Sequence, residues 1–206
     1  MSKIKEFFKA NYKPVINPII VLLCICIVIS AALAGANMIT KDRIAELSKQ
    51  QKQESMEKIF VGAEFKQRED SNGEYFVAVL NGEYIGYVFT EVGKGYGGAG
   101  ITVMTGINAD GSIKAVSIID AADETPGLGQ NVTKERFYKQ FSGMTGEVTI
   151  NKTDADPNKN EIMPETGATI SSKAVKDAVN ACMERFKNAN NQSANNSETE
   201  AATDEK

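Results

Sequence analysis

The hydrophobic pattern of the chain begins with one long apolar run. Residues 15–36 read VINPIIVLLCICIVISAALAGA and contain no charged side chain. A helix needs about 20 apolar residues to cross the hydrocarbon core of a bilayer, so the run predicts a transmembrane helix over residues 15–38, with the lipid bilayer as its partner. The alternative is a cleaved signal peptide, because alanines recur at the end of the run, but the apolar part of such peptides spans only about 7–15 residues.

Basic residues do not decide which way this helix crosses the membrane. Four lysines lie in residues 1–14 and four basic residues lie in residues 41–52, so the positive-inside rule gives a tie. Long polar domains behind a single N-terminal span are usually translocated whatever their charge. We therefore expect a single-pass protein of the cell (inner) membrane, with residues 1–14 cytoplasmic and the polar domain on the outer, periplasmic side.

The polar part of the chain opens with a helical pattern in residues 39–60. Its apolar residues recur at helical spacing among lysine, glutamine and glutamate: Ile44, Leu47, Met56 and Ile59. So thin an apolar stripe is typical of an amphipathic helix. It predicts a helical stalk that leaves the membrane.

Alternating apolar and polar residues then predict two antiparallel hairpins. The first, residues 75–90, turns at an Asn-Gly dipeptide, which tolerates the positive φ angles of a type I′ turn. The second, residues 100–119, turns near an Asp-Gly dipeptide. Between them, residues 93–100 read GKGYGGAG. Two interpretations of these glycines stay open: a tight connection between strands, or close approach of the backbone to a ligand.

The last part of the chain reads as a helix followed by a polar tail. The apolar residues of 171–188 fall on one helical face: Val175, Val179, Cys182 and Phe186. Residues 189–206 contain no large apolar side chain, so we expect a disordered tail there. With a short helix predicted at 133–141 and a strand at 148–151, the fold class is α+β. One N-terminal transmembrane helix precedes a single domain, residues 61–188, of antiparallel hairpins packed on helices.

Composition excludes several kinds of function. The chain has no His, and its three cysteines form no CxxC pair, which argues against zinc, haem or iron–sulfur sites made by this chain alone. The formal net charge is -4, so the chain lacks the surplus of cations that binds nucleic acid. We expect no metal site, no nucleic-acid partner and no catalytic acid, base or nucleophile.

Two short segments carry the candidate chemistry. Residues 123–129 (DETPGLG) follow the second hairpin, and residues 166–169 (TGAT) precede the last helix. The second segment places hydroxyls and backbone N–H groups at a helix N-terminus, where the first N–H groups have no internal partner and the helix dipole favours an anion. That arrangement favours a phosphate site. The alternative is a loop with an ordinary helix cap at Ser171 or Ser172.

The order of these motifs resembles a known family. ETPGLG, a polar stretch and then TGATISSKAV resemble the FMN-binding domain of the RnfG and NqrC electron-transport subunits, as does GKGYGG followed by strand, turn and strand into ETPGLG. The resemblance covers residues 15–186 and identifies residues 61–188 as an FMN-binding domain. It implies covalent FMN, which a flavin transferase joins through its phosphate to the side chain of Thr169.

The resemblance also implies roles for the residues beside Thr169. Thr166, Gly167 and Ala168 give the backbone a close approach to the cofactor. The helix that begins near Ile170 stabilises the negative charge that the phosphodiester keeps.

The other motif is implied to lie beside the isoalloxazine ring of FMN, through Glu124, Thr125, Pro126, Gly127, Leu128 and Gly129. Pro126 and Leu128 cover the apolar face of the ring, while Thr125 and backbone groups bond to its polar edge. The two glycines keep side chains out of the way. Glu124 has a second interpretation, as a local cap.

The function that this resemblance implies is an electron relay, most like RnfG. Such a subunit sits in a membrane complex that moves electrons between ferredoxin and NAD and couples them to Na⁺ or H⁺ transport. The chain then acts with other subunits and is not expected to be an enzyme alone. Three alternatives stay open: an NqrC-like subunit of a Na⁺-translocating NADH:quinone reductase, a stand-alone membrane-anchored flavoprotein for extracellular electron transfer, and a non-redox membrane-anchored binding module.

Overall fold

A computed structural model describes the backbone of residues 2–201 and the side chains of residues 16–44 and 46–190. The chain divides into two compact units, residues 1–50 and residues 51–206. The second unit thus begins earlier than the domain start that the sequence predicts, because the end of the predicted stalk belongs to it.

The first unit consists of helix α1 (Ser2–Ile59), which continues into the second unit. The predicted span and stalk are therefore parts of one uninterrupted helix. By length and composition, α1 is the one helix among the described residues that can cross a membrane. The apolar side chains of its residues 16–34, Leu22 and Val28 among them, are exposed, as a surface that faces lipid requires.

The second unit is built on a five-stranded antiparallel sheet in the order β1-β2-β3-β4-β5. The strands are β1 (Glu64–Asp70), β2 (Gly73–Leu80), β3 (Glu83–Gly93), β4 (Ile101–Asn108) and β5 (Ile113–Asp120). Both predicted hairpins are confirmed, as β2–β3 and β4–β5. Asn81 and Gly82 at the first turn have φ angles of 54° and 86°, the two positive angles of a type I′ turn. Strand β1 is an addition that the sequence pattern does not predict.

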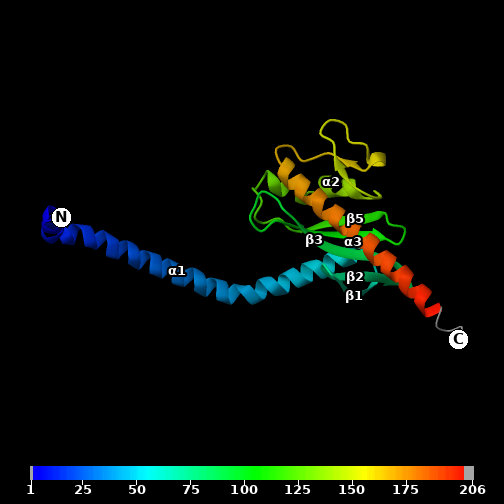
Figure 1. Ribbon diagram of the computed structural model, residues 1–206, viewed down its shortest axis with the longest axis horizontal. Coiled ribbons are helices and arrows are strands. Elements are labelled where there is room, and N and C mark those ends of the chain that lie inside the picture. Colours follow the sequence, from blue (N-terminus) through cyan, green and yellow to red (C-terminus); the bar gives the residue numbers. More distant parts are fainter. Residues whose placement is uncertain (1, 202–206) are drawn as a thin grey trace. The chain divides into compact units, whose positions relative to one another are not determined.

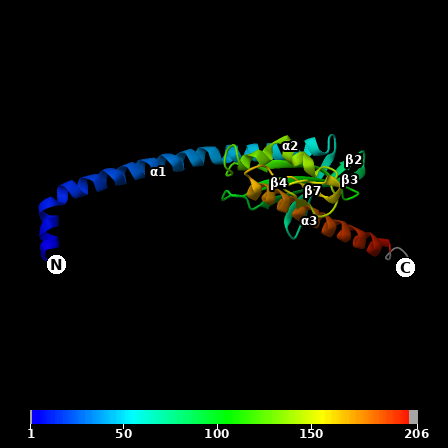
Figure 2. The ribbon, with the colours of Figure 1, turned by 90° about the horizontal axis from the view of Figure 1, so that it is seen from above.

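A different helix covers each face of the sheet (Figures 1 and 2). Helix α3 (Thr169–Ala201) packs on β3 and β4 over the larger core cluster. On the other face, Met56 and Ile59 from the end of α1, with Phe60 directly after it, pack against Val88 and Met104. The end of the predicted stalk is thus part of the hydrophobic core.

Glycines on the central strands allow these close approaches. A Cβ atom on Gly106 would lie 2.2 Å from the Ile59 side chain, and one on Gly93 would lie 1.9 Å from the carbonyl oxygen of Ala174. Real Cβ atoms do not come that close, so any side chain at Gly93 would push α3 off the sheet.

Short elements join the sheet to α3. They are the 3₁₀ turns η1 (Gly129–Thr133), η2 (Lys139–Phe141) and η3 (Pro157–Lys159), helix α2 (Glu135–Tyr138), and the parallel pair β6 (Thr149–Ile150) and β7 (Glu161–Ile162). The helix predicted at 133–141 is thus broken into 3₁₀ and α turns. The strand predicted at 148–151 is present as β6.

Helix α3 has the buried face that its sequence predicts, since Val175, Val179, Cys182 and Phe186 are all in the core. The structure continues α3 to Ala201, whereas the sequence predicts a disordered tail from residue 189. Residues 189–201 contain neither Gly nor Pro, so no strong helix breaker ends the helix there. Residues 202–206 of the predicted tail lie outside the described residues.

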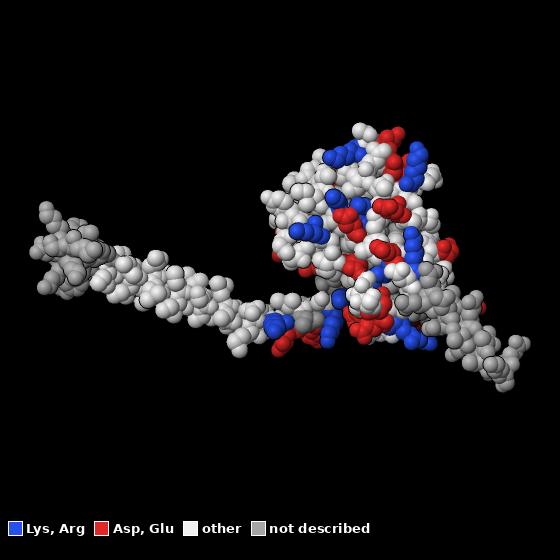
Figure 3. Space-filling model, viewed as in Figure 1, with Lys and Arg blue, Asp and Glu red and all other residues white. Residues whose placement is uncertain are grey.

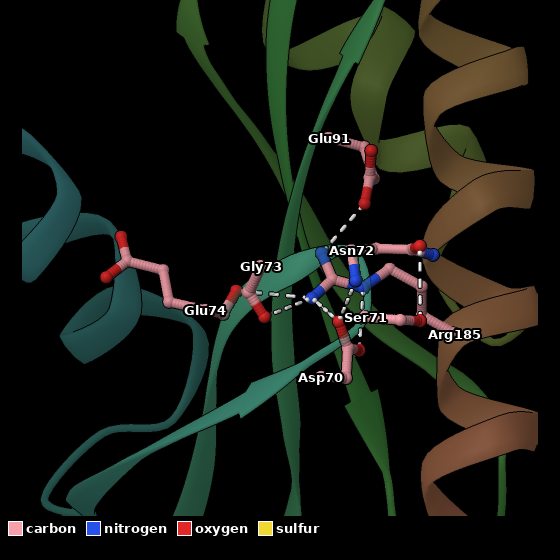
Figure 4. Close-up of polar contacts among 7 residues, drawn as sticks. All are labelled: Asp70, Ser71, Asn72, Gly73, Glu74, Glu91 and Arg185. Atoms are coloured by element: carbon pink, nitrogen blue, oxygen red, sulfur yellow. Dashed lines mark hydrogen bonds and ion pairs between the residues drawn. The ribbon is translucent and has the colours of Figure 1, made fainter.

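A buried arginine ties α3 to the turn between β1 and β2 and to β3 (Figure 4). The Arg185 side chain is 3% exposed. Its guanidinium donates to both carboxylate oxygens of Asp70, at 3.0 and 2.8 Å, and to Glu91 at 2.7 Å. It also donates to the carbonyl oxygens of Gly73 and Glu74, and it lies over the ring of Phe89. A buried charge with so many partners is fully compensated.

Candidate functional site

A cavity of about 430 Å³ opens at the N-terminal end of α3. Three separate segments line it, the glycine-rich loop, the ETPGLG motif and the TGAT motif with the start of α3. The lining residues are Tyr96, Glu124, Thr125, Leu128, Gly129, Gly167, Ala168, Thr169, Ile170 and Ser171. The structure thus brings together the two motifs that the sequence singles out. A volume of about 300–1,000 Å³ is typical of small-molecule sites.

Three of the predicted site residues do not line the cavity: Thr166, Pro126 and Gly127. The last two shape a turn instead. The N–H of Leu128 donates to the carbonyl oxygen of Thr125 at 3.1 Å, and Gly127 has a φ of 75°. Proline at the second position and a positive φ at the third are typical of a type II turn. Pro126 and Gly127 therefore act by directing Leu128, whose side chain would lie 3.3 Å from a Cβ atom on Gly167.

The start of α3 has backbone donors to spare. The first helix bond runs from the N–H of Ser172 to the carbonyl oxygen of Ala168, at 2.9 Å. The N–H groups of Thr169, Ile170 and Ser171 take part in no hydrogen bond between described residues. Free N–H groups at the positive end of a helix dipole favour an anion.

The hydroxyl groups near this helix end differ in availability. Ser171 and Ser172 are buried; Ser171 donates to Glu124 at 2.5 Å, and Ser172 accepts from the N–H of Glu165 at 2.9 Å. Thr169 is exposed, and its hydroxyl takes part in no hydrogen bond among the described residues. Of the hydroxyls that line the cavity on α3, that of Thr169 is therefore the accessible one.

Glu124 bridges two segments that are far from it in sequence, so the second interpretation, a local cap, does not describe it. Its side chain is buried, at 1% exposure. One carboxylate oxygen accepts the N–H groups of Tyr96 and Gly97, at 2.9 and 3.1 Å, and the other accepts the Ser171 hydroxyl. The neighbouring Asp123 accepts the N–H of Ala99 at 3.0 Å.

Sequence reasoning missed Tyr96 and Ser171 as lining residues. Tyr96 stands in GKGYGGAG, whose glycines did suggest close approach to a ligand, and an aromatic residue among them was the available signal. For Ser171, the sequence predicts only a helix cap. Its partner, Glu124, lies 47 positions away, a distance over which sequence spacing carries no information about contact.

The cavity lining carries no cation, and its one charged side chain is the carboxylate of Glu124. None of the lining residues is Lys or Arg. Arg136 forms two hydrogen bonds to the buried carboxylate of Glu165, which raise the pKa of the guanidinium above its ordinary value. Figure 3 shows Lys and Arg interspersed with Asp and Glu on the visible face of the second unit. That face has no basic patch of the kind that binds nucleic acid.

Comparisons with known proteins agree with this geometry. The family model of the FMN-binding domain matches residues 95–184, which include every residue that lines the cavity. The G subunit of the Na⁺-translocating ferredoxin:NAD⁺ oxidoreductase complex of Acetobacterium woodii is 31% identical, over 89% of this chain and 97% of that one. The G subunit of the proton-translocating complex of Clostridium ljungdahlii is also 31% identical, over 78% and 85% of the two chains.

A solved structure, Shewanella oneidensis NqrC, has a TM-score of 0.44 and 21% identity, and the match covers 52% of this chain and 53% of that one. The family and helix α1 together associate the chain with a membrane. On its similarity to the two relatives over most of their length, the chain belongs to the RnfG family, the G subunits of ion-translocating ferredoxin:NAD⁺ oxidoreductase complexes, and it contains that family's FMN-binding domain.

Proposed function

We propose that this chain is an electron relay that carries FMN as a phosphoester on Thr169. One observation carries the proposal: the cavity joins the ETPGLG motif to an exposed threonine hydroxyl beside three unused N–H groups. A flavin transferase must reach the hydroxyl that it modifies. Among the cavity-lining hydroxyls of α3, only that of Thr169 is open to it, because Ser171 is buried against Glu124.

The free N–H groups of Thr169, Ile170 and Ser171 suit a phosphodiester that keeps one negative charge. Such groups act together with the helix dipole, whose effect is worth about 0.3–1 kcal/mol at an exposed site. That is a weak hold for an anion, and no Lys or Arg lines the cavity to strengthen it. A covalent bond removes the need for such a cation and keeps the cofactor on an exposed domain.

Leu128 and Ile170 provide the apolar surface for the flavin ring. Their side chains are 46% and 54% exposed, although both line the cavity. When bound, FMN supplies transfer of one or two electrons, and the protein supplies position and electrostatics. These exposed apolar side chains lie beside the attachment residue and give the ring a surface to pack against.

The site fits a role within a larger assembly. We propose that the other subunits of an RnfG-type complex are the partners of this chain and that the complex couples electron transfer between ferredoxin and NAD to transport of Na⁺ or H⁺. The 31% identical relatives, which are G subunits of such complexes, support this assignment over an NqrC-like one. Helix α1 anchors the chain, with residues 1–14 in the cytoplasm and the FMN-binding domain outside.

The test is the intact mass of the full chain made together with a flavin transferase. Wild type should gain the mass of one FMN phosphoester and give a fluorescent band on a denaturing gel. Thr169→Ala should lose both signals completely and stay folded. Thr149→Ala is the control, because Thr149 is an exposed threonine that lies in neither motif and does not line the cavity; it should keep both signals. A bare wild-type chain, or flavin retained by Thr169→Ala, would refute the proposal.

A further inference from the structure

We propose that Tyr96 forms a third wall of the flavin pocket, facing the ring, and that Glu124 is the positioning residue that holds this wall against α3. The inference rests on the proposed function for the identity of the ligand. The wall and its support are features of the chain itself.

Tyr96 is an exposed aromatic residue that lines the cavity. Its side chain is 74% exposed and lines the cavity together with the ETPGLG turn and the start of α3. A large aromatic side chain with a free face loses no contact when a flat ring covers it, and aromatic pairs in offset or edge-to-face contact gain beyond simple burial. With Leu128 and Ile170, Tyr96 gives the cavity apolar surface from three separate segments.

The loop that carries Tyr96 is held by carboxylates rather than by a regular strand. Two successive N–H groups, of Tyr96 and Gly97, converge on one oxygen of Glu124. A Cβ atom on Gly95 would lie 2.1 Å from that same oxygen, and one on Gly97 would lie 2.4 Å from the carbonyl oxygen of Asp123. The glycines of GKGYGGAG therefore allow close approach to Asp123 and Glu124. This close approach is to groups of the protein itself, which neither of the two interpretations from the sequence predicts.

Glu124 also connects the loop to the attachment helix. Its second oxygen accepts the Ser171 hydroxyl at 2.5 Å, and a Cβ atom on Gly129 would lie 2.4 Å from this oxygen. A buried carboxylate persists only when hydrogen bonds compensate the loss of water. One buried side chain thus fixes the position of Tyr96 relative to Thr169, two positions before Ser171.

The inference is tested in two states of the full chain in detergent. Without the flavin transferase, amide hydrogen exchange of Tyr96 and Gly97 reports the hold on the loop. It should quicken severalfold in Glu124→Ala and stay slow in Glu124→Gln, because glutamine keeps an acceptor oxygen for the two N–H groups and an amide for Ser171. Glu124→Asp, which is one methylene too short to reach both partners, should also quicken the exchange, and it covers the case in which the alanine variant does not fold.

With FMN attached, quenching of flavin fluorescence by iodide reports the wall. Tyr96→Leu should make the flavin severalfold more accessible to iodide, whereas Tyr96→Phe should keep it shielded. Glu124→Asp should increase the accessibility of the flavin to iodide as much as Tyr96→Leu does. In the double variant Glu124→Asp/Tyr96→Leu, the flavin should be no more accessible than in Tyr96→Leu alone, because Glu124 acts through Tyr96.

Three results would overturn the inference: unchanged quenching in Tyr96→Leu, unchanged amide exchange in both shortened Glu124 variants, or additive effects in the double variant. These outcomes are distinct from failure of the proposed function. That failure appears as a wild-type chain without attached flavin, whereas the amide-exchange arm is measured without flavin at all.

Discussion

Two buried polar clusters contact helix α3, one around Arg185 and one around Glu124. They differ in whether hydrogen-bond donors next to them remain without a partner. Around Arg185, the guanidinium has partners in Asp70, Glu91 and two backbone carbonyl oxygens, and it does not line the cavity at the N-terminal end of α3. Around Glu124, the carboxylate is equally well paired. Next to it, however, the first three N–H groups of α3 and the Thr169 hydroxyl stay without a partner among the described residues and adjoin a cavity of about 430 Å³.

The difference separates a structural cluster from a binding site on one helix. Buried polar groups in folded proteins are nearly always hydrogen-bonded. The Arg185 cluster, in which every group has a partner and which we call the saturated cluster, is therefore explained by its contribution to stability. Donors that remain free next to an apolar rim call for a ligand that supplies acceptors. The two clusters should therefore respond differently to substitution, one in stability and the other in cofactor attachment.

The largest expected effect on stability comes from substituting Arg185 in the saturated cluster. Arg185→Met leaves the partly buried carboxylates of Asp70 and Glu91, 16% and 25% exposed, without their cation. Breaking a fully buried ion pair from one side costs about 3–5 kcal/mol, so the loss here should lie at or below the lower end of that range. Urea unfolding of the full chain, followed by tyrosine fluorescence because the chain has no Trp, measures the loss. The fraction of folded chain that carries FMN should be unchanged.

Lys139→Met is the control for this substitution. Lys139 pairs with Glu135 on the surface of α2, where both side chains are exposed, and such pairs contribute little. It should unfold at the urea concentration of wild type. An Arg185→Met chain as stable as wild type would show that the saturated cluster does not stabilise the fold.

A smaller effect is expected where α3 touches the sheet between the two clusters. In Gly93→Ala, the new Cβ would lie 1.9 Å from the backbone carbonyl of Ala174, and overpacking of this kind costs about 1–3 kcal/mol. Gly98→Ala is the matched control in the same segment, because its Cβ would come no closer than 3.9 Å to any other group. Thermal unfolding should separate the two variants. Equal melting temperatures would mean that α3 shifts freely on β3.

The sequence predicts those features of the fold that depend on residues close together in the chain. The hairpin at Asn81 and the buried face of α3 follow from local turn chemistry and helical period, and both are confirmed. Strand β1 (EFKQRED) was not predicted, because an edge strand that is mostly charged has no apolar alternation. The core role of Met56 and Ile59 was missed for a related reason, since a stripe shows a helix but not what covers it.

The candidate site likewise has one part that the sequence predicts and one that it does not. That the two motifs meet at one cavity agrees with the resemblance that linked them, but the hydrogen bonds that join the segments could not be read from spacing. Glu124 reaches Ser171 across 47 positions and Tyr96 across 28. An aromatic residue among glycines is the one sequence signal for Tyr96, and its place in the cavity lining is visible only in the folded structure.

Acid should weaken the saturated cluster before it affects attached flavin. Burial raises the pKa of Asp70, but hydrogen bonds from Arg185 and from backbone N–H groups outweigh burial and hold it below its ordinary value of 3.8. A carboxyl with a lowered pKa in the folded state contributes stability that is present above the ordinary pKa and is lost as pH falls through the folded-state value. The stability gap between wild type and Asp70→Asn should therefore narrow from pH 7 to pH 3 in urea titrations. A gap that stays constant would contradict the pairing.

The smallest expected effect concerns the cavity at the start of α3. Without the covalent bond, this cavity should bind FMN and riboflavin with nearly equal affinity. The Thr169→Ala chain has no attachment point, and its cavity offers a phosphate three N–H groups but no Lys or Arg, with the Glu124 carboxylate nearby. The helix end favours an anion by about 0.3–1 kcal/mol, so free FMN should bind at most about fivefold more tightly than riboflavin, since about 1.4 kcal/mol corresponds to tenfold. Titrations followed by flavin fluorescence measure both affinities. Adding Thr166→Arg supplies a cation beside the helix start, and it should create a preference for FMN that fades with salt. A strong, salt-sensitive preference for FMN without that arginine would mean that the phosphate is held by a cation, and the covalent bond would then need a different physical reason.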